Sequence, residues 1–303
     1  MESYHVPVLF AESIDLLNIR PDGMYVDLTF GGGGHSRGIL ERLSAKGRLL
    51  GFDQDSDARR NVPDDARFTF IESNFRFMRG QLRLHGYEQV DGVLADLGVS
   101  SHHFDTRQRG FSFRFDAPLD MRMNQRAALT AADVVNKYDH AALTRILRDY
   151  GELDAPHRAA ACIVRSREQH PLRTIDELVA CVAPVTPRGA ESKFLSKLFQ
   201  ALRIEVNGEM EALRMMLEQS ERVLRPGGRL VVIAYHSLED RTVKNFMRSG
   251  RFDGLPEKDF YGRVRSCWQV LTRKALTPSA GEVERNPRSR SAKLRAAVRL
   301  DGK

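Results

Sequence analysis

The feature that most constrains the fold is an alternation of strand-like and helix-like segments over the first hundred residues. Four short runs rich in β-branched and aromatic residues lie at 24–30, 47–53, 67–75 and 90–98, and helix-like stretches separate them. Such an alternation predicts a parallel sheet with helices on its faces. Residues 104–203 show helical periodicity without a comparable strand run, and the α/β pattern then resumes with an apolar run at 229–237.

The sequence therefore predicts a discontinuous α/β domain formed by residues 1–103 and 204–303, interrupted by a helical insertion at 104–203. Within the insertion, Thr130 and Thr174 each precede an acidic residue by three positions, a spacing typical of a helix start. Near the C-terminus, the runs at 266–276 and 292–300 are expected to form an antiparallel pair.

A glycine-rich turn, Gly31 to Gly34, follows the first strand and predicts a site for a nucleotide-like ligand. Glycines let the backbone approach a ligand closely, and a helix N-terminus directs N–H groups towards it. Asp53 ends the next strand, 19 residues after Gly34, where a carboxylate suits ribose hydroxyls. The turn lacks the G-x-G-x-x-G pattern and follows Asp27, which favours a methyl donor, S-adenosylmethionine, over a nicotinamide cofactor.

Three candidates for a catalytic group end other predicted strands. Asp96 ends the fourth strand, and Tyr235 and His236 end the apolar run at 229–237. Parallel strands place their carboxyl ends at one edge of the sheet, where ligands bind. An exocyclic base amine needs an acceptor for its N–H bonds and in-line placement against the methyl group. The sequence leaves open whether Asp96 has this role or only lines the cofactor pocket.

Two segments predict contact with RNA. Residues 107–123 interleave arginines with phenylalanines, which suits splayed single-stranded bases, although a buried phenylalanine face is the alternative. The last 19 residues hold seven Lys or Arg and one acid, nearly the whole net charge of +7, which suits phosphate binding or a solvated charge run. The expected RNA contacts are Arg107, Arg109, Phe111, Phe113, Arg114, Arg288, Arg290, Lys293 and Arg295.

Three scattered cysteines, Cys162, Cys181 and Cys267, give neither a disulfide framework nor a metal site, so no metal is expected. The N-terminal residues lack the pattern of a signal peptide, and the apolar runs are too short to span a bilayer. The sequence thus favours a cytoplasmic protein without membrane contact. It leaves the choice between monomer and dimer open.

Several idiosyncratic stretches resemble the bacterial small-subunit ribosomal RNA methyltransferase H family. They are HVPVL (5–9), DLTFGGGGHS (27–36), DLGVSS (96–101), RGFSFRFDAPLDMRM (109–123), FQALRIEVNGE (199–209), YHSLEDR (235–241) and NPRSRSAKLRA (286–296). The resemblance implies a class I S-adenosylmethionine-dependent methyltransferase fold, Rossmann-like with a mostly parallel sheet, and an inserted helical domain for substrate recognition. It also implies methylation of the N4 amine of a cytosine in the decoding centre, at the P site, of 16S ribosomal RNA within the small subunit.

The resemblance also implies the donor site. The turn would contribute Gly33, Gly34 and His35, Asp53 would hold the ribose, Phe75 would pack by the adenine, and Asp96 would line the methionine end. The family usually has Pro-Gln where this chain has His102-His103, and that Gln contacts the donor. His103 can donate a hydrogen bond in its place, but its charge would vary near neutral pH.

Two other functions remain open at this stage. A DNA amino-methyltransferase usually carries a Pro-Pro-aromatic run after the fourth strand, whereas this chain has Gly98-Val99-Ser100. A non-catalytic RNA-binding or ribosome assembly factor would have equal use for the basic tail and the helical insertion.

Overall fold

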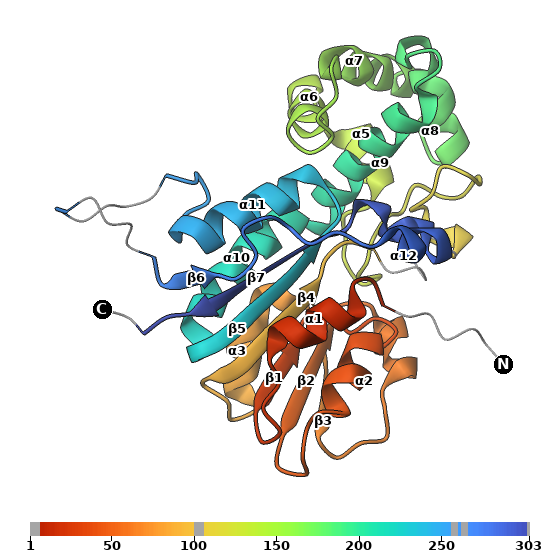
Figure 1. Cartoon of the computed structure of the whole chain (residues 1–303). Helices are drawn as coiled ribbons and strands as arrows, with labels where there is room; N and C mark the ends of the chain where they lie inside the picture. Colours follow the sequence, from red (N-terminus) through yellow and green to blue (C-terminus); the bar gives the residue numbers. More distant parts are fainter. Residues whose placement is uncertain (1–6, 100–105, 256–259, 262–265, 302–303) are drawn as a thin grey trace. The chain divides into compact units, whose positions relative to one another are not determined.

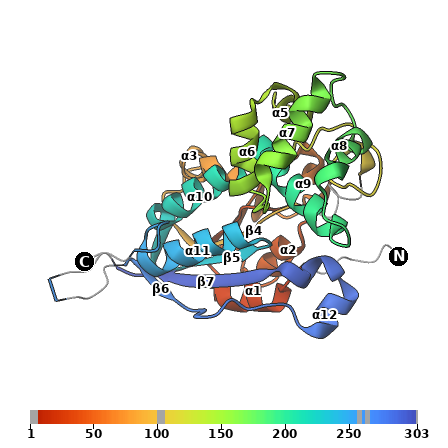
Figure 2. The ribbon, with the colours of Figure 1, turned by 90° about the horizontal axis from the view of Figure 1, so that it is seen from above.

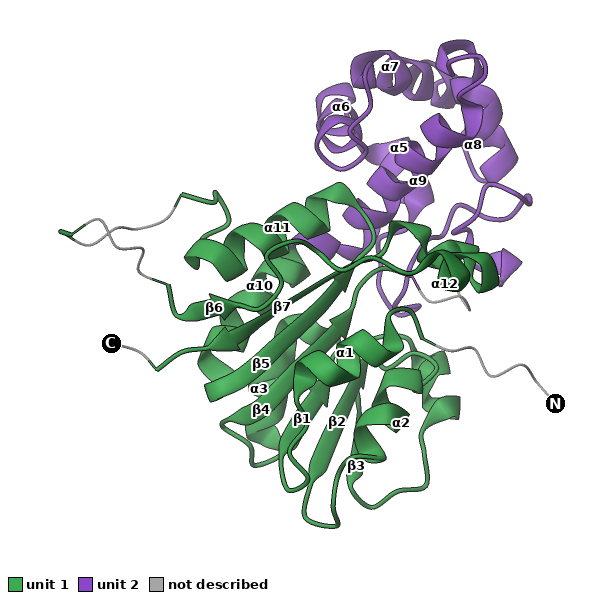
Figure 3. Ribbon diagram, viewed as in Figure 1, with its two compact units in different colours: residues 1–98, 211–303 green, residues 99–210 purple. Residues whose placement is uncertain are grey.

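The computed structural model describes residues 7–99, 106–255, 260–261 and 266–301, and the chain divides into two compact units (Figure 3). The α/β unit comprises residues 1–98 and 211–303, and the helical unit comprises residues 99–210. The first junction lies five residues before the boundary expected from the sequence, and the second lies seven residues after it.

The centre of the α/β unit is a seven-stranded sheet with the order β3-β2-β1-β4-β5-β7-β6 (Figure 1). Its strands are β1 (Met24–Asp27), β2 (Arg48–Asp53), β3 (Phe68–Glu72), β4 (Val90–Asp96), β5 (Leu224–Ala234), β6 (Trp268–Val270) and β7 (Lys293–Arg299). The first five strands pair in parallel, and β7 pairs antiparallel with both β5 and β6. The mostly parallel sheet confirms the expected fold class, and the C-terminal antiparallel pair is also confirmed.

The strand order reverses between β1 and β4, and this reversal positions the candidate site. The chain runs from β1 outwards to β2 and β3, then returns to β4 on the other side of β1. In open α/β sheets the crevice at such a switch point, outside the carboxyl ends of the strands, is where ligands bind. Asp27, Asp53 and Asp96 are the last residues of β1, β2 and β4.

Helices cover both faces of this sheet. On one face, α1 (Phe10–Leu17) and α2 (Gly34–Leu40) share an apolar cluster with Leu294 and Ala296 of β7. Side chains alternate along a strand, so Arg295 points to the other face, where it binds Asp240 of α11 (Ser237–Ser249). Figure 2 shows α10 (Glu209–Val223) and α11 across the sheet from α1. The unit also contains α3 (Met78–Leu84), α12 (Ala280–Arg285) and the 3-10 turns Ser56–Asn61, Phe75–Phe77 and Pro287–Ser291.

The helical unit has its own core. Its helices are α5 (Ala131–Lys137), α6 (His140–Asp149), α7 (Pro156–Arg167), α8 (Ile175–Val182) and α9 (Glu191–Asn207), with 3-10 turns at Arg107–Arg109 and Ala183–Val185. Thr130 and Thr174 form complete capping boxes with Asp133 and Glu177, which confirms both expected helix starts. Fully buried side chains from all five helices fill the centre, among them Val134, Leu147, Ile163, Leu178 and Leu202. In the described part of the chain, no helix has the length and apolar character needed to cross a bilayer.

Candidate active site

The turn between β1 and α2 depends on glycines at its end. Gly33 caps α2 with a left-handed φ of 73°, which favours glycine, and a Cβ there would lie 2.9 Å from the Phe30 ring. A Cβ on Gly34 would come closer still to Pro7. The N–H of Gly33 donates to the carbonyl of Phe30 at 2.7 Å, so this glycine shapes the turn with its own backbone hydrogen bond.

Asp53 ties the end of β2 to this glycine turn. Its Oδ2 accepts the N–H of Gly31 at 2.8 Å, and its Oδ1 accepts the N–H of Asp55 at 2.9 Å. The two bonds fix the orientation of the carboxylate beside the turn. An ionised carboxylate is an acceptor, so it suits the two hydroxyls of a ribose.

Asp27 and His35 are buried titratable residues beside the turn. The Asp27 carboxylate accepts the Ser36 hydroxyl at 2.7 Å and the Thr29 N–H at 3.1 Å. Burial nevertheless raises the pKa of Asp27 to about 6, against the lowering effect of these hydrogen bonds. Burial also lowers the pKa of His35 to about 4, so its imidazole is neutral at pH 7. The His35 ring stacks on Phe10 with 6.0 Å between the ring centroids.

Asp96 ends β4 beside these groups, with a side chain that is 23% exposed. Its backbone N–H donates to the Thr29 hydroxyl at 2.7 Å. Its Oδ1 accepts the Tyr235 hydroxyl at 2.8 Å, and its Oδ2 lies 3.9 Å from Nδ1 of His35. Burial raises the pKa of the Asp96 carboxyl to about 7, and the nearby charge of Asp27 acts in the same direction. A carboxylate in this state can exchange a proton near neutral pH.

The structure separates the other two catalytic candidates. Tyr235 directs its hydroxyl to Asp96, while its backbone N–H donates to Glu239 at 2.9 Å. His236 instead caps α11, and its Nδ1 accepts the Glu239 N–H at 3.4 Å in a capping box. Its Nε2 also lies 3.1 Å from Glu239. The imidazole of His236 is therefore engaged in starting a helix, whereas Tyr235 contacts the candidate acceptor.

Of two further residues expected to contact the methyl donor, the structure describes Phe75 but not His103. Phe75 opens the 3-10 turn that follows β3 and is half-buried. It lies three residues beyond Glu72, which pairs with Asp53 at the same edge of the sheet. His103 lies outside the described residues, as does His102.

Burial changes the expectation for the arginine- and phenylalanine-rich segment. Arg109 is 7% exposed and donates to the carbonyls of Arg122 and Met123, and Phe111 is 6% exposed within the core of the helical unit. Phe113 packs edge-on against Phe199. Arg109 and Phe111 are thus buried in the helical unit and offer little surface to RNA, whereas Phe113 is half-buried.

Among the arginines and phenylalanines of the segment, Arg107, Arg114 and Phe115 are exposed. The guanidinium of Arg107 lies 4.3 Å from the centroid of the Phe115 ring, a cation–π arrangement at the surface. These side chains retain the properties that the sequence suggested for RNA contact.

The basic C-terminal segment is largely part of the fold and not a free charged tail. Lys293 and Arg295 belong to β7, an internal strand, and both pair with Asp240 of α11. Arg295 is 8% exposed, so it offers little surface for the RNA contact expected from the sequence. Arg288 and Arg290 lie in the exposed 3-10 turn before β7.

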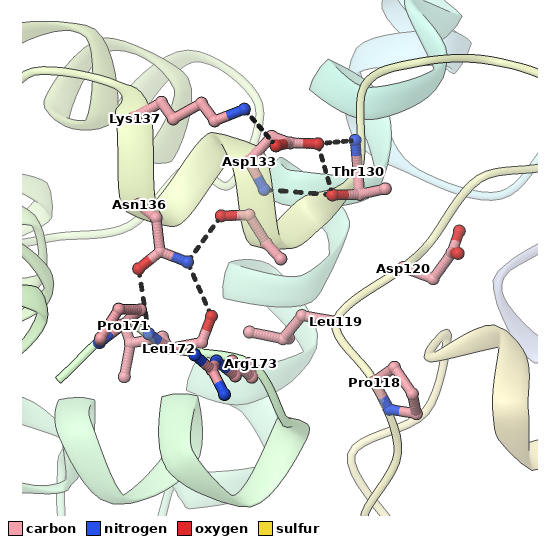
Figure 4. A pocket seen from close by; sticks show the side chains of 11 residues that line it. Pro118, Leu119, Asp120, Thr130, Asp133, Asn136, Lys137, Pro171, Leu172 and Arg173 are labelled. Atoms are coloured by element: carbon pink, nitrogen blue, oxygen red, sulfur yellow. Dashed lines mark hydrogen bonds and ion pairs between the residues drawn. The ribbon is translucent and has the colours of Figure 1, made fainter.

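The helical unit also carries an open pocket of about 360 Å³ beside α5 (Figure 4). Its polar side chains serve the fold. Asp133 accepts both the N–H and the hydroxyl of Thr130 and pairs with Lys137 at 2.7 Å. The side-chain amide of Asn136 donates to the carbonyl of Leu172 at 2.7 Å and accepts its N–H at 2.9 Å. These bonds join α5 to the segment before α8, and we assign no ligand to the pocket.

Sequence reasoning missed three residues that organise the site: Thr29, Ser36 and Glu239. Thr29 holds the backbone of Asp96, and Ser36 holds the carboxylate of Asp27. Both contacts cross between elements, so spacing alone could not reveal them. Glu239 does follow His236 at capping-box spacing, but histidine is outside the usual set of capping residues.

The charge of the site fits a cationic nucleoside. Asp27 and Asp96 are carboxylates at one edge of the sheet, and neither forms an ion pair with an arginine or lysine among the described residues. A sulfonium group would supply the missing positive charge, while Asp53 would accept the ribose hydroxyls. The sheet order, the glycine turn after β1 and the acids ending β2 and β4 together define a class I S-adenosylmethionine-dependent methyltransferase.

Comparison with known proteins identifies the family. The model of the MraW methylase family matches residues 2–300, and the chain belongs to this family. The ribosomal RNA small subunit methyltransferase H of Parabacteroides distasonis is 58% identical over 298 residues, which are 98% of each chain. The protein of the same name from Bacteroides thetaiotaomicron is 58% identical over 97% of each chain. Among solved structures, an rRNA methylase from Streptococcus thermophilus is 10% identical with a TM-score of 0.45, over 98% of this chain and 99% of that chain.

Proposed function

We propose that this protein transfers a methyl group from S-adenosylmethionine to the N4 amine of a cytosine in the decoding centre, at the P site, of 16S ribosomal RNA. Its relatives over the full length are named as methyltransferases of small-subunit ribosomal RNA, which supports the substrate class. The substrate would be met in the cytoplasm, within the small ribosomal subunit.

The observation that carries the proposal is the Asp96 carboxylate beside the glycine turn. The lone pair of an exocyclic amine is delocalised into the ring, so the amine is a weak nucleophile. An acceptor that holds one of its N–H bonds aligns the nitrogen and removes the charge that develops on it. Asp96 supplies such an acceptor at the end of β4, and its raised pKa suits it to take a proton.

The exposed cations are the proposed contacts with RNA. They are Arg107 and Arg114 in the helical unit, which is the proposed substrate-recognition domain, and Arg288 and Arg290 in the turn before β7. A base stacked within a helix could not reach a carboxylate at a sheet edge. The target cytosine is therefore unpaired or flipped out when it reacts.

The proposal is tested by transfer of a tritiated methyl group to small subunits from a strain that lacks this modification. The wild-type protein should label 16S ribosomal RNA in these particles, and Asp96→Asn should lower the rate at least about a hundredfold, as loss of a proton acceptor does. Duplex DNA serves as the competing substrate. Labelling of DNA but not of subunits would replace RNA with DNA as the substrate, and no labelling of either would reject the enzyme.

A further inference from the structure

We infer that Tyr235 is a positioning residue for methyl transfer: its hydroxyl occupies Oδ1 of Asp96 and leaves Oδ2 as the oxygen that receives the amine proton. This inference rests on the proposed function, because it assigns a geometry to the acceptor named there. Tyr235 acts through Asp96 and need not touch the substrate itself.

Two contacts fix the acceptor from opposite ends of the residue. The Thr29 hydroxyl accepts the backbone N–H of Asp96 at 2.7 Å, and the Tyr235 hydroxyl donates to Oδ1 at 2.8 Å. A carboxylate held at its backbone and at one oxygen has little rotational freedom. The remaining oxygen, Oδ2, lies 3.9 Å from His35 Nδ1, on the side of the glycine turn.

Tyr235 is itself held in place. Its backbone N–H donates to the Glu239 carboxylate, which also belongs to the capping box that starts α11. A Cβ on Gly98 would lie only 3.3 Å from the Tyr235 ring, so the chain after β4 passes closely over that ring. Gly98 has a φ of 95°, a conformation that other residues rarely adopt. The glycine in this position therefore allows the close approach between β4 and the tyrosine.

The groups that face Asp96 show how the Tyr235 hydroxyl affects the ionisation of the Asp96 carboxyl. Burial raises the pKa of Asp96, the carboxylates of Asp27 and Glu239 raise it further, and the Tyr235 hydrogen bond lowers it. His35 is neutral at pH 7 because burial lowers its pKa to about 4. Burial and the Asp96 charge raise the pKa of Tyr235, so the hydroxyl keeps its proton and donates. Tyr235 thus favours the ionised form of Asp96, the form that can accept a proton.

The amine nitrogen forms a bond to the methyl carbon as the carbon–sulfur bond breaks, and the bonding electrons go to sulfur, which becomes a neutral thioether. The nitrogen loses one N–H proton to Oδ2 of Asp96, and the proton leaves the neutral acid to water after the product departs. Throughout, the Tyr235 hydroxyl remains the donor to Oδ1.

The test compares single-turnover methyl transfer by wild-type protein, Tyr235→Phe and Tyr25→Phe between pH 5.5 and 9. Tyr25 is the matched control, since its buried hydroxyl accepts the Arg20 N–H at 2.7 Å and makes no contact with Asp96. For Tyr235→Phe we expect the pH at which the rate is half-maximal to rise by about one unit. The rate at pH 7 should fall roughly fivefold and largely recover at pH 9, with KM for the subunit within about threefold. Tyr25→Phe should leave the profile in place.

A titration of the Asp96 carboxyl by carbon-13 NMR, assigned with Asp96→Asn, gives a readout that does not need turnover. The pKa of Asp96 should rise in Tyr235→Phe and stay unchanged in Tyr25→Phe. A uniform loss of rate at every pH, with the same Asp96 titration as wild type, would assign Tyr235 a packing role and overturn the inference. Absence of transfer by the wild-type protein would reject the proposed function instead, and with it the role of Tyr235 in the reaction.

Discussion

At the scale of residues, the site brings together buried carboxylates whose ionisation does not stabilise the ligand-free protein. Asp27 and Asp96 both end central strands, and burial raises the pKa of each, to about 6 and about 7. Ionising them costs free energy until a cation arrives. In the proposed function a sulfonium donor would supply that cation, so the buried acids that destabilise the free protein would stabilise the complex.

This cost can be measured at Asp96. Because its pKa is raised, the Asp96 carboxyl between about pH 4 and pH 7 is protonated in the folded state but ionised in the unfolded state. The stability of the free protein therefore falls as pH rises through this window. At pH 8, Asp96→Asn should raise the free energy of unfolding by about 1–3 kcal/mol, less than the full shift implies because the side chain is partly exposed. Urea unfolding at pH 8 and pH 4 checks this.

The gain from Asp96→Asn should be nearly lost near pH 4, where the wild-type carboxyl is protonated in the folded state and about half protonated in the unfolded state. Asp64→Asn, at an exposed position of the same unit, is the control and should change stability little at either pH. A loss of stability at pH 8 in the Asp96 variant would mean that its hydrogen bonds outweigh its burial.

A second prediction at this scale concerns Asp53. Replacing it with alanine removes the expected acceptor for the ribose hydroxyls and frees the N–H of Gly31. Binding of S-adenosylmethionine should weaken about 10- to 100-fold, since a hydrogen bond to a charged group contributes roughly 1.5–3 kcal/mol. Isothermal titration calorimetry measures it, with Asp64→Ala as control. Equal affinity in both variants would remove Asp53 from the donor site.

At the scale of elements, β7 shows why a basic segment read from sequence can mislead. Its residues alternate between a face packed on α1 and a face that meets α11, and Arg295 points to the second. Burial opposes ionisation of Asp240, but the hydrogen bond and charge of Arg295, together with Lys293, lower its pKa overall. Lys293 and Arg295 thus pair with an acid that lies 53 and 55 residues away in sequence.

The pairing predicts a pH-dependent loss of stability. Arg295→Ala leaves the mostly buried Asp240 with Lys293 as its remaining partner and should lower the free energy of unfolding by about 2 kcal/mol at pH 7. Because the folded pKa of Asp240 is lowered, its contribution is present above pH 4 and is lost as pH falls further. The difference from wild type should therefore shrink at pH 3. Arg290→Ala, in the exposed turn, should change stability by less than about 0.5 kcal/mol.

The order of elements could be predicted from the sequence because periodicity and glycine turns are local signals. The four N-terminal strands, the capping boxes at Thr130 and Thr174, and the C-terminal antiparallel pair all follow from such signals. The burial of Arg109 and Arg295 could not be predicted, because it depends on carbonyls and a carboxylate that only the folded chain brings near. The link from Tyr235 to Asp96 spans 139 positions and is equally invisible in one sequence.

At the scale of the whole molecule, the chain combines a unit built for the methyl donor with a separately packed helical unit. Four of the proposed RNA contacts are exposed: Arg107 and Arg114 in the helical unit, and Arg288 and Arg290 in the α/β unit. RNA binding should therefore depend on single cations in both units and not on one charged tail.

This distribution predicts a stepwise loss of salt dependence. Arg107→Ala and Arg114→Ala should each reduce the slope of log affinity against log salt by about 0.7–0.9, the release expected for one phosphate contact. Filter binding to small subunits at several salt concentrations measures the slope. Arg158→Ala, an exposed arginine of α7 outside the segment, is the control. An unchanged slope in all three variants would place the RNA contacts elsewhere.

We propose that this chain methylates the N4 amine of one cytosine of 16S ribosomal RNA and that Asp96 accepts the amine proton. The most direct measurement is mass spectrometry of 16S ribosomal RNA from cells that lack the protein, complemented with wild type or with Asp96→Asn. In cells without the protein, one decoding-centre cytosine should lack its N4 methyl group, regain it with wild type and not regain it with the variant. An unchanged modification in cells without the protein, or full restoration by Asp96→Asn, would contradict it.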